Sequence, residues 1–455
     1  MAPRVPFAAD FTYLLTLINF GFMSNSPRVG SLWPAVILAA VVAVISGLLV
    51  AAPAVLPSRS GAAEAAQWRP PIGPVFNNPA GKAKARQRVV QRIKDAIAHT
   101  PKGETIRIST YSFDLEQVGK LLVKAHNRGV HVQVLANDNY VSGLEKRLQR
   151  RFGKNVKKPT FLRICKGSCR GSGSKGNLHI KIASFTRTGS ARNVIISTSG
   201  NLSHGGVNAQ WNDGYTLIGK TDLFKTWVKL FNQLKLDKKA SPRYVSYSSA
   251  RVNAAFQRKL ARAQGGTVVA RKASSDSVVS RLRKIGCAAP KGYGVKHKTA
   301  IRINMRAWYG NRGLKIAAVV AKLKKKGCTV KVIGSGMSAP VRKRLTKVGI
   351  PVRYGDWDYG HHPSVVDEDN VVYGARCYDH LKYMTVNGKY SGKGTRSVWT
   401  GSENWSAPSL GNDEVVFRFP VNSYYRAYLN RFNLMWGNHN MTHPVGQHPT
   451  RRPCH

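Results

Sequence analysis

A small group of residues that could hold and cleave a phosphate ester occurs twice in this chain. Each copy has a histidine, a lysine two residues later, and a serine and an asparagine about twenty residues further on. On an extended strand, residues i and i+2 point the same way, so the imidazole and the ammonium would share one face. The residues are His179, Lys181, Ser199 and Asn201 in the first copy, and His380, Lys382, Ser402 and Asn404 in the second.

These residue types suit displacement at phosphorus. The anionic oxygens of a phosphodiester repel a nucleophile, so a site must first neutralise them. Lysine and asparagine can donate to the non-bridging oxygens, and these bonds strengthen as charge builds in the transition state. One imidazole can then attack phosphorus to give a phosphohistidine, while the other protonates the leaving alkoxide and later activates water. Histidine suits both roles because its ordinary pKa of about 6.5 lies near neutral pH.

The sequence around the two copies repeats as well, which predicts two similar halves. Each half has a strand, a helix, a strand, a basic helix and a short strand before its histidine, and an aromatic-rich helix at its end. In the first half these segments are 105–111, 115–128, 130–135, 143–152, 161–164 and 223–234. In the second half they are 301–305, 314–326, 329–333, 339–348, 351–354 and 423–436. Strands that alternate with helices predict an α/β fold in which each half has a mostly parallel sheet flanked by helices.

The predicted domain organisation follows from this repeat. The halves span 70–240 and 266–455, and a linker region rich in Ser, Ala, Lys and Arg covers 241–265. We expect helices at 252–263 and 275–285, as counterparts of a helix at 86–99. A pseudo-twofold arrangement of the halves would bring His179 and His380 together in one shared active site.

On these motifs the chain resembles the phospholipase D superfamily, whose signature is H-x-K-x4-D followed by G-S-x-N, usually present twice. The resemblance covers nearly all of the chain after residue 70. There are departures from the pattern. Thr186 and Asn387 stand where the family has Asp, and the first G-S-x-N is written Thr198-Ser199-Gly200-Asn201. Some members, such as the tyrosyl-DNA phosphodiesterases, also lack that Asp.

The resemblance implies roles for particular residues. Catalytic residues would be His179, Lys181, Asn201, Asp213, His380, Lys382, Asn404 and Asp413, and substrate-binding residues would be Ser199 and Ser402. By family analogy His179 is the nucleophile and His380 the acid and base, although the sequence itself is nearly symmetric. An acid at the place of Asp213 or Asp413 accepts a hydrogen bond from a catalytic imidazole in this family. Both could instead be turn residues at strand starts, and Glu414 is a rival for the second role.

This mechanism needs no metal ion or other cofactor, and we expect none. The remaining histidines come without an H-E-x-x-H or C-x-x-C pattern. We therefore interpret His361, His362, His439, His443, His448 and His455 as surface residues.

The charge of the chain predicts an anionic partner. Its 72 Lys and Arg residues outnumber 21 Asp and Glu residues, which gives a formal net charge of +51. Such an excess attracts polyanions of any kind, including nucleic acid and anionic membrane surfaces, without distinguishing among them.

The N-terminal region predicts export. Residues 35–52 are apolar and uncharged, and Ala63-Glu64-Ala65 is a small-x-small pattern that suits signal peptidase. We expect a signal peptide at 1–65, with Met23 as an alternative start. The apolar stretch is also close to the length that spans a bilayer, so an N-terminal membrane anchor is the alternative.

Cysteine usage agrees with export, because an even number of cysteines in an exported protein suggests disulfides. Six cysteines allow many pairings, and the sequence does not choose among them. Cys165 and Cys169 could close a small loop, Cys287 with Cys328 is a plausible second bridge, and Cys377 would then reach Cys454.

Together with the resemblance, these features favour a secreted phospholipase D-type phosphodiesterase that hydrolyses phospholipid head groups and could transfer the phosphatidyl group to an alcohol. A secreted, metal-independent nuclease is the alternative, supported by the charge. A non-catalytic polyanion-binding protein is the alternative of another class, but it would not need intact His, Lys and Asn in both halves. We expect a monomer.

Overall fold

The computed structural model describes most of the chain after residue 66. Described are residues 67–171, 176–241, 244–258, 261–264, 267–270, 276–357, 365–366, 372–373, 377–445, 447 and 453–454. They belong to one compact unit, Ser58–His455. The predicted signal peptide, with its alternative start at Met23 and its alternative reading as a membrane anchor, lies outside these residues. Within the described ranges, no helix has the length and apolar character needed to cross a membrane.

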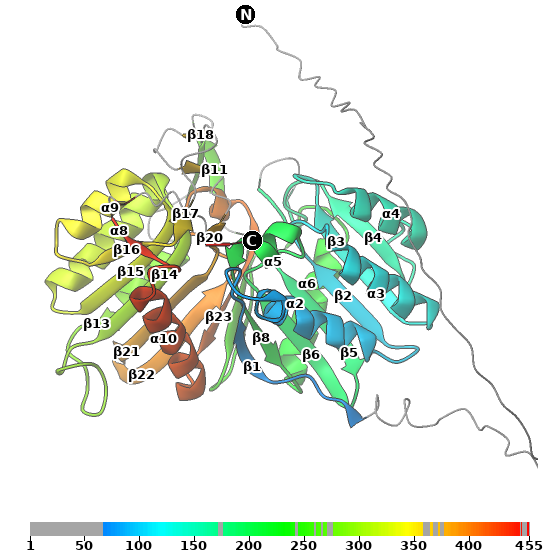
Figure 1. Cartoon of the computed structure of the whole chain (residues 1–455), viewed down its shortest axis with the longest axis horizontal. Helices are drawn as coiled ribbons and strands as arrows, with labels where there is room; N and C mark the ends of the chain where they lie inside the picture. Colours follow the sequence, from blue (N-terminus) through cyan, green and yellow to red (C-terminus); the bar gives the residue numbers. More distant parts are fainter. Residues whose placement is uncertain are drawn as a thin grey trace, which may run out of the picture. The chain divides into compact units, whose positions relative to one another are not determined.

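A mixed sheet flanked by helices forms the first half (Figure 1). Its strands lie in the order β1-β8-β6-β5-β2-β3-β4. They are β1 (Gly73–Phe76), β2 (Thr105–Ser109), β3 (His131–Asn137), β4 (Phe161–Cys165), β5 (Ile182–Thr188), β6 (Ala191–Thr198) and β8 (Asp213–Leu217). The helices are α2 (Ala83–Ala98), α3 (Glu116–Asn127), α4 (Gly143–Phe152), α5 (His204–Asn208) and α6 (Thr221–Leu234).

The second half repeats this plan around a second sheet, in the order β24-β16-β15-β14-β21-β22-β23-β10-β9, with β13 also paired to β21. Its strands are β9 (Tyr244–Ser248), β10 (Asn253–Arg258), β13 (Ile285–Gly286), β14 (Ala300–Trp308), β15 (Thr329–Met337), β16 (Val352–Tyr354), β21 (Lys382–Tyr390), β22 (Lys393–Gly401), β23 (Asp413–Phe419) and β24 (His443–Pro444). The helices are α7 (Ser277–Arg283), α8 (Gly310–Lys325), α9 (Ala339–Thr346) and α10 (Asn422–Gly437), with a short 3-10 turn, η2 (Pro408–Leu410).

Smaller strands complete the described structure. They are β7 (Gln210–Trp211), β17 (Asp356–Trp357) and β20 (Cys377–Asp379), which form one short sheet, and the pairs β11 (Ala261–Gln264) with β12 (Thr267–Ala270) and β18 (Val365–Val366) with β19 (Val372–Tyr373). The short sheet joins the halves, because β7 comes from the first and β20 from the second.

The two predicted α/β halves are confirmed. In each, the three strands that alternate with helices run parallel: β2, β3 and β4 in the first half, and β14, β15 and β16 in the second. From β5 and β21 onward the strands run antiparallel. The connections explain the difference, because a parallel pair needs a crossover such as a helix, whereas β5 and β6 are joined by a tight turn.

Local sequence patterns account for these elements. In β2, buried Ile106 and Ile108 alternate with half-buried neighbours, the period of two of a strand with one buried face. α4 begins with a capping box, in which the Ser142 hydroxyl accepts from the Glu145 N–H and the Glu145 carboxylate accepts from the Ser142 N–H. These bonds satisfy N–H groups that a first helical turn leaves unpaired, so they fix where the helix starts.

An aromatic core joins the two sheets. Tyr215 of β8 contacts the rings of Phe417 and Phe419 of β23 edge to face, with centroids 5.3 and 5.1 Å apart. Trp227 of α6 belongs to the same buried cluster and lies against Phe256 of β10. Burial of large rings is a major source of stability. The packing of these rings therefore also fixes the position of the first half relative to the second. Any site shared by the two halves depends on that position.

One prediction in the linker region is wrong. Within the helix expected at 252–263, Asn253–Arg258 form the strand β10 instead, which pairs with β23 and with β9 in the stretch where we expect a linker. Val252, Ala254 and Phe256 are buried at every second position, which is the period of a strand. The helix expected at 275–285 is confirmed as α7, whose start is capped by the Asp276 carboxylate.

The three proposed disulfides are all present: Cys165–Cys169, Cys287–Cys328 and Cys377–Cys454. The last one connects β20, which leads directly into the second histidine, to the C-terminal end of the chain.

Candidate active site

The two histidines lie where the halves meet. Each sits in an extended segment just before a long strand, not inside it: His179 precedes β5, and His380 precedes Lys382, the first residue of β21. The His179 N–H donates to the Asp413 carbonyl at 3.0 Å, and the His380 N–H donates to the Trp211 carbonyl at 3.0 Å. Each histidine is thus held by the backbone of the opposite half, as the pseudo-twofold arrangement predicts.

The two lysines adopt matching positions. Lys181 Nζ donates to the His179 carbonyl, and Lys382 Nζ donates to the His380 carbonyl, both at 2.8 Å. Both side chains are buried, with exposed fractions of 1% and 3%. Burial lowers the pKa of Lys181 to about 7. Burial, together with the charges of Lys181 and Arg306, lowers the pKa of Lys382 well below its ordinary value. An anion bound between the lysines would reverse both shifts, because an opposite charge favours the protonated form.

The histidines differ in what orients them. His179 Nδ1 lies 2.9 and 3.1 Å from the carboxylate oxygens of Glu414, and His380 Nδ1 lies 3.0 Å from Asn212 Oδ1. A carboxylate or amide oxygen only accepts, so in both rings Nδ1 carries the hydrogen and Nε2 is left for chemistry. One imidazole therefore has an anionic partner and the other a neutral one.

The pKa shifts of the two histidines and of Glu414 reflect this difference in partners. Burial alone would raise the pKa of Glu414, but His179, the Ser402 hydroxyl and Lys181 outweigh it and lower the pKa to about 2. Burial lowers the pKa of His179, with Glu414 opposing the shift and Lys181 adding to it. Burial also lowers the pKa of His380 far below its ordinary value, and there the nearby charges of Lys382, Lys181 and Arg306 all act in the same direction. Both shifts favour the neutral form of the rings in the free protein.

The prediction that Asp213 and Asp413 orient the histidines is wrong. Asp213 Oδ2 accepts from the hydroxyls of Tyr428 and Thr400, at 2.5 and 2.7 Å. Asp413 Oδ2 accepts from the Ser168 hydroxyl at 3.1 Å and from the Arg170 N–H at 3.3 Å. Both carboxylates are buried in structural contacts, while Glu414, the rival for the second role, is the residue that holds His179.

Strand register explains this correction. Thr198 pairs with Gly214 in the first half, and the equivalent Gly401 pairs with Val416 in the second. Asn212 therefore corresponds to Glu414, although the sequence suggests that the Asn-Asp doublets at 212–213 and 412–413 match. Successive residues of a strand point to opposite faces, so the neighbour of an Asp reaches the histidine and the Asp itself does not.

The predicted substrate contacts of Ser199 and Ser402 are also corrected. Both residues are buried, with exposed fractions of 1% and 0%. The Ser199 hydroxyl donates to Asn212 Oδ1 and accepts from the Asp213 N–H. The Ser402 hydroxyl donates to Glu414 and accepts from the Val415 N–H. Each serine thus positions the residue that orients a histidine.

The asparagines remain available to a substrate. Asn201 and Asn404 are half-buried and follow the serines on equivalent loops. The Oδ1 atom of each is buried and has no hydrogen-bond partner among the described residues. An amide Oδ1 only accepts, so the part of each side chain that could donate to a phosphate oxygen is its Nδ2 group.

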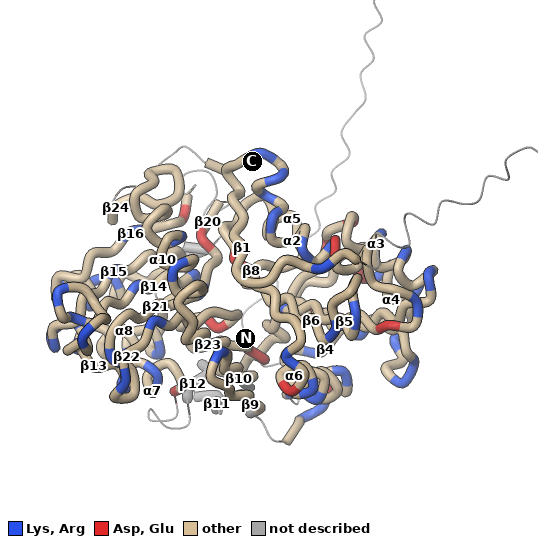
Figure 2. The backbone as a smooth tube through the Cα atoms, turned by 90° about the horizontal axis from the view of Figure 1, so that it is seen from below, with Lys and Arg blue, Asp and Glu red and all other residues tan. Residues whose placement is uncertain are grey.

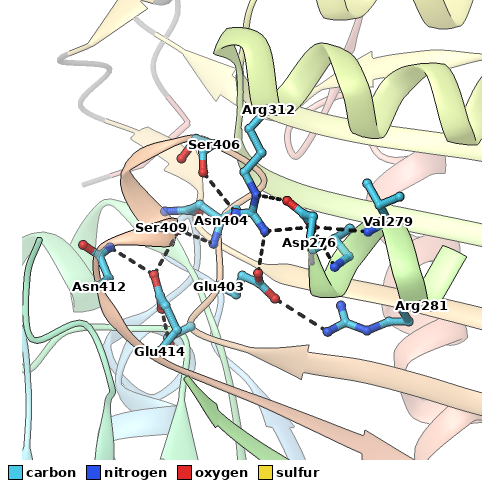
Figure 3. Close-up of polar contacts among 12 residues, drawn as sticks. Asp276, Val279, Arg281, Arg312, Glu403, Asn404, Ser406, Ser409, Asn412 and Glu414 are labelled. Carbon is cyan, nitrogen blue, oxygen red and sulfur yellow. Dashed lines mark hydrogen bonds and ion pairs between the residues drawn. The ribbon is translucent and has the colours of Figure 1, made fainter. Parts of the chain in front are cut away.

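A buried ion network supports the Asn404 loop, as Figure 3 shows. Arg312 donates to Asp276 at 2.6 Å and to Glu403 at 2.8 Å. It also donates to the carbonyls of Asn404 and Ser406, both at 3.0 Å. The loop is joined to the histidine partner as well, because the Ser409 hydroxyl accepts from the Asn404 N–H and donates to Glu414.

Sequence reasoning missed two residues at the site. Tyr111 lies edge to face against His179, with ring centroids 5.5 Å apart, and 5.6 Å from Lys181 Nζ. Arg306 lies over Tyr378, whose ring is 5.9 Å from that of His380. Tyr111 and Arg306 occupy equivalent positions, because the strands β2 and β14 pair in the same way with β3 and β15. Tyr111 follows β2 by two residues and Arg306 lies near the end of β14, and these matching places in the repeat could have revealed them.

The residues at the place of the family Asp lie away from the histidines. The Thr186 hydroxyl accepts from the Thr105 N–H and donates to Glu104, and Asn387 Oδ1 accepts from the Gly294 N–H. Both have structural contacts within their own halves.

Metal ligands are not gathered anywhere in the described ranges, where no three or more His, Cys, Asp and Glu side chains form a group that could hold an ion. The interpretation of His443 as a surface residue is wrong. Its exposed fraction is 3%, and its Nε2 lies 2.8 Å from the Asp356 carbonyl. His361 and His362 lie outside the described residues.

Comparison with known proteins finds similarity in the sequence of the first half and in the fold of most of the chain. A family model described as "cardiolipin synthase, PLD-like domain" matches residues 90–235. Phosphatidylserine synthase from Haemophilus influenzae Rd KW20 is similar in structure, with a TM-score of 0.50, 12% identity, and coverage of 85% of this chain and 92% of that one. Polyphosphate kinase from Porphyromonas gingivalis has a TM-score of 0.50 and 15% identity over 83% of this chain and 53% of that one. This chain thus spans about half the length of that kinase. No protein with a curated description matches the sequence of this chain.

The family model thus covers a PLD-like domain in the first half alone, and the structural similarities show the fold of both halves.

Proposed function

We propose that the protein is a phosphodiesterase that works through a phosphohistidine on His179, and that it is a secreted enzyme of the phospholipase D type. The observation that carries the proposal is the meeting of two H-x-K segments between the halves, each histidine with its Nδ1 occupied and its Nε2 left for chemistry. Lys181, Lys382, Asn201 and Asn404 would hold the non-bridging oxygens of the substrate.

The unequal partners of the histidines support His179 as the nucleophile. When Nε2 attacks phosphorus, the P–N bond forms, and the ring becomes cationic because Nδ1 keeps its hydrogen. Glu414 supplies a fixed negative charge next to that cation. As the P–O bond to the leaving group breaks, the leaving oxygen takes a proton from His380. Water then attacks phosphorus and gives its proton to His380, and the P–N bond breaks.

His380 suits the acid role for a complementary reason. It has a neutral partner and cations around it, so its protonated form gives up the proton readily. A bound phosphodiester brings the negative charge that the free site lacks. The pKa of His380 then rises, and the ring can carry a proton at the moment when the leaving group needs it.

Phospholipid head groups are the first substrate class that we propose. The match of residues 90–235 to a cardiolipin synthase PLD-like domain supports this choice, and the three disulfides suit an exported protein. A secreted nuclease is the second candidate, favoured by the spread of Lys and Arg over both halves (Figure 2). A backbone that presents many phosphates gains most from such a surface.

The test uses the purified protein with bis(4-nitrophenyl) phosphate, phosphatidylcholine and plasmid DNA. We expect turnover of the small phosphodiester in excess EDTA, and a covalent phosphoenzyme after rapid denaturation with a labelled substrate. With a phospholipid substrate, a primary alcohol should accept the phosphatidyl group. His179→Ala should abolish turnover and labelling, whereas His126→Ala, a histidine packed on Phe152 away from the site, should not. Turnover without a phosphoenzyme, or unchanged turnover in His179→Ala, would refute the mechanism. Cleavage of DNA but of no phospholipid would replace the first substrate class with the second.

A further inference from the structure

Arg306 is a cation beside the site that the mechanism above leaves unused. Its backbone lies next to the second H-x-K segment, because Met305 pairs with Lys382 and the Arg306 N–H donates to the Leu381 carbonyl at 2.9 Å. The residue is half-buried, at the end of β14 that faces His380 in the register of the sheet.

Tyr378 supports the arginine. The Arg306 Cζ atom lies 4.3 Å from the centroid of the Tyr378 ring, which in turn lies edge to face against His380 at 5.9 Å. The Tyr378 hydroxyl accepts a hydrogen bond from Gln210 Nε2, and this contact fixes the ring. A guanidinium stacked on an aromatic face keeps the N–H donors at its edges directed outward, where they can bind an anion.

The side chain of Arg306 lacks an anionic partner. In the part of the chain that the structure describes, this side chain forms no ion pair and no hydrogen bond. Its guanidinium has a cation–π contact with the Tyr378 ring. Its charge nevertheless reaches the site, since it is among the groups that lower the pKa of His380 and of Lys382. Lys181, Lys382 and Arg306 gather beside His380, where Glu414 and Asp213 are the acids that act on Lys382. Cations placed this close together attract a bound anion.

The mechanism tells which part of a substrate meets Arg306. In an in-line displacement, His179 attacks from one side, and the leaving oxygen departs on the opposite side, toward His380. Arg306 lies on the His380 side. The equivalent position on the His179 side holds the uncharged ring of Tyr111. Arg306 therefore adds positive charge only on the side from which the leaving group departs.

We propose that Arg306 and Tyr378 form a binding subsite for a second anionic group, a phosphate carried by the leaving alcohol of the substrate. This inference rests on the proposed function, and it narrows the substrate class. An oligonucleotide meets the requirement because its leaving nucleoside carries the next phosphate. A phospholipid meets it when its head group carries a phosphate. A choline head group is cationic, and Arg306 would repel it.

The kinetic test compares substrates with and without the second phosphate. The nucleotide pair is TpT and pTpTp, in which either nucleoside can leave with a phosphate. The lipid pair is phosphatidylglycerol and phosphatidylglycerol phosphate in neutral detergent micelles. For at least one pair, we expect the extra phosphate to raise kcat/KM about tenfold, the typical effect of a charge-assisted hydrogen bond. Arg306→Ala should remove this preference, and Arg306→Lys should keep part of it.

A matched control is Arg396→Ala. Arg396 also covers a tyrosine ring, with its Cζ atom 4.9 Å from the centroid of Tyr293, but it lies toward the far end of β22. This variant should keep the full preference. The pair that shows the preference identifies whether the anion belongs to a nucleic acid or to a lipid head group. Absence of any preference in the wild-type protein, or a preference that survives Arg306→Ala, would overturn the subsite.

A binding measurement separates the subsite from the proposed function. The dissociation constants of TpT and pTpTp, and of the two lipids, can be measured with His179→Ala by calorimetry without turnover. We expect the second phosphate to tighten binding, and we expect Arg306→Ala in the same background to abolish that gain. If the protein cleaves no phosphodiester but still shows this difference, the proposed function fails and the subsite stands. If the protein cleaves phosphodiesters and shows no difference in binding, the subsite fails alone.

Discussion

The two halves of this protein share one geometry and differ in charge. Each holds its histidine on the backbone of the other half, each lysine donates to the carbonyl of its histidine, and each serine fixes the residue that orients a histidine. Equivalent positions, however, carry different residues. Glu414 in the second half corresponds to Asn212 in the first, and Arg306 in the second half corresponds to Tyr111 in the first. The shared geometry brings the two H-x-K segments together, and the differences would give the proposed reaction a direction.

The loops that carry the asparagines show the same contrast. Behind Asn404, Glu403 joins a buried network with Arg312 and Asp276, whereas Gly200 occupies the matching place before Asn201. The second half therefore relies on buried charges at a place where the first half packs without them.

The largest effect that the comparison predicts concerns the histidines themselves. His179→Ala should lower the turnover of every phosphodiester by at least about a thousandfold, because no covalent intermediate can form. His380→Ala should cost about as much with an alkyl leaving group. With bis(4-nitrophenyl) phosphate it should still release one equivalent of 4-nitrophenol in a rapid first turnover, because that leaving group needs no proton. Stopped-flow absorbance measures the burst, and a burst in His179→Ala instead would reverse the two roles.

The second prediction tests the network behind Asn404. Arg312→Met removes a buried cation from between Asp276 and Glu403, and should lower the free energy of unfolding by about 3 kcal/mol. A control in the first turn of α3, the corresponding helix of the first half, is Gln117, whose side chain accepts a hydrogen bond from Lys94 at 2.7 Å. Gln117→Met should stay within about 0.5 kcal/mol. Urea denaturation measures both, and equal losses would show that the halves do not differ in this respect.

The third prediction concerns the partners of the histidines. Glu414→Gln keeps a hydrogen-bond acceptor but removes the charge, and should lower kcat about a hundredfold because the cationic phosphohistidine loses its counter-charge. Asn212→Asp adds a carboxylate next to His380, which raises the pKa of that ring. Its pH profile for kcat should move to higher pH, with a change in the maximum of less than about tenfold. A greater loss in Asn212→Asp than in Glu414→Gln would contradict our assignment of the nucleophile.

The fourth prediction compares the disulfides. Cys165–Cys169 joins residues 4 apart, and Cys287–Cys328 joins residues 41 apart. Loop-closure entropy predicts losses of about 2 kcal/mol for Cys165→Ala with Cys169→Ala, and about 4 kcal/mol for Cys287→Ala with Cys328→Ala. Denaturant titration of the two double variants gives the comparison. A larger loss for the short loop would mean that this disulfide stabilises the folded structure around the nearby His179 segment, and that restriction of the unfolded chain is not its main effect.

The smallest expected effect is the dependence on pH. The pKa of Lys181 is about 7 in the free protein, and only the protonated form attracts the substrate phosphate. As pH rises through 7, kcat/KM for bis(4-nitrophenyl) phosphate should fall, by up to about tenfold per pH unit. Lys181→Arg should move this fall to higher pH, because a guanidinium keeps its proton. An identical profile in the variant would show that another group titrates.

The sequence by itself determined the repeat and therefore most of the fold. The period of buried residues placed the strands and helices around β2 to β4 and β14 to β16, and the spacing of the H-x-K segments identified His179, Lys181, His380 and Lys382. These features are local, so a pattern of residue types can reveal them. The pattern failed at residues 252–263, where alternating burial at Val252, Ala254 and Phe256 shows a strand that pairs with the distant β23.

Only the tertiary structure decided which residues complete the site. The Asn-Asp doublets at 212–213 and 412–413 look equivalent along the chain, but the pairing of β6 with β8 and of β22 with β23 makes Asn212 the counterpart of Glu414. A shift along a strand changes which side chain faces a given point, and strand pairing is set by packing between distant segments. The same holds for Arg306, because its place beside His380 depends on how β14 pairs with β21 and where Tyr378 lies.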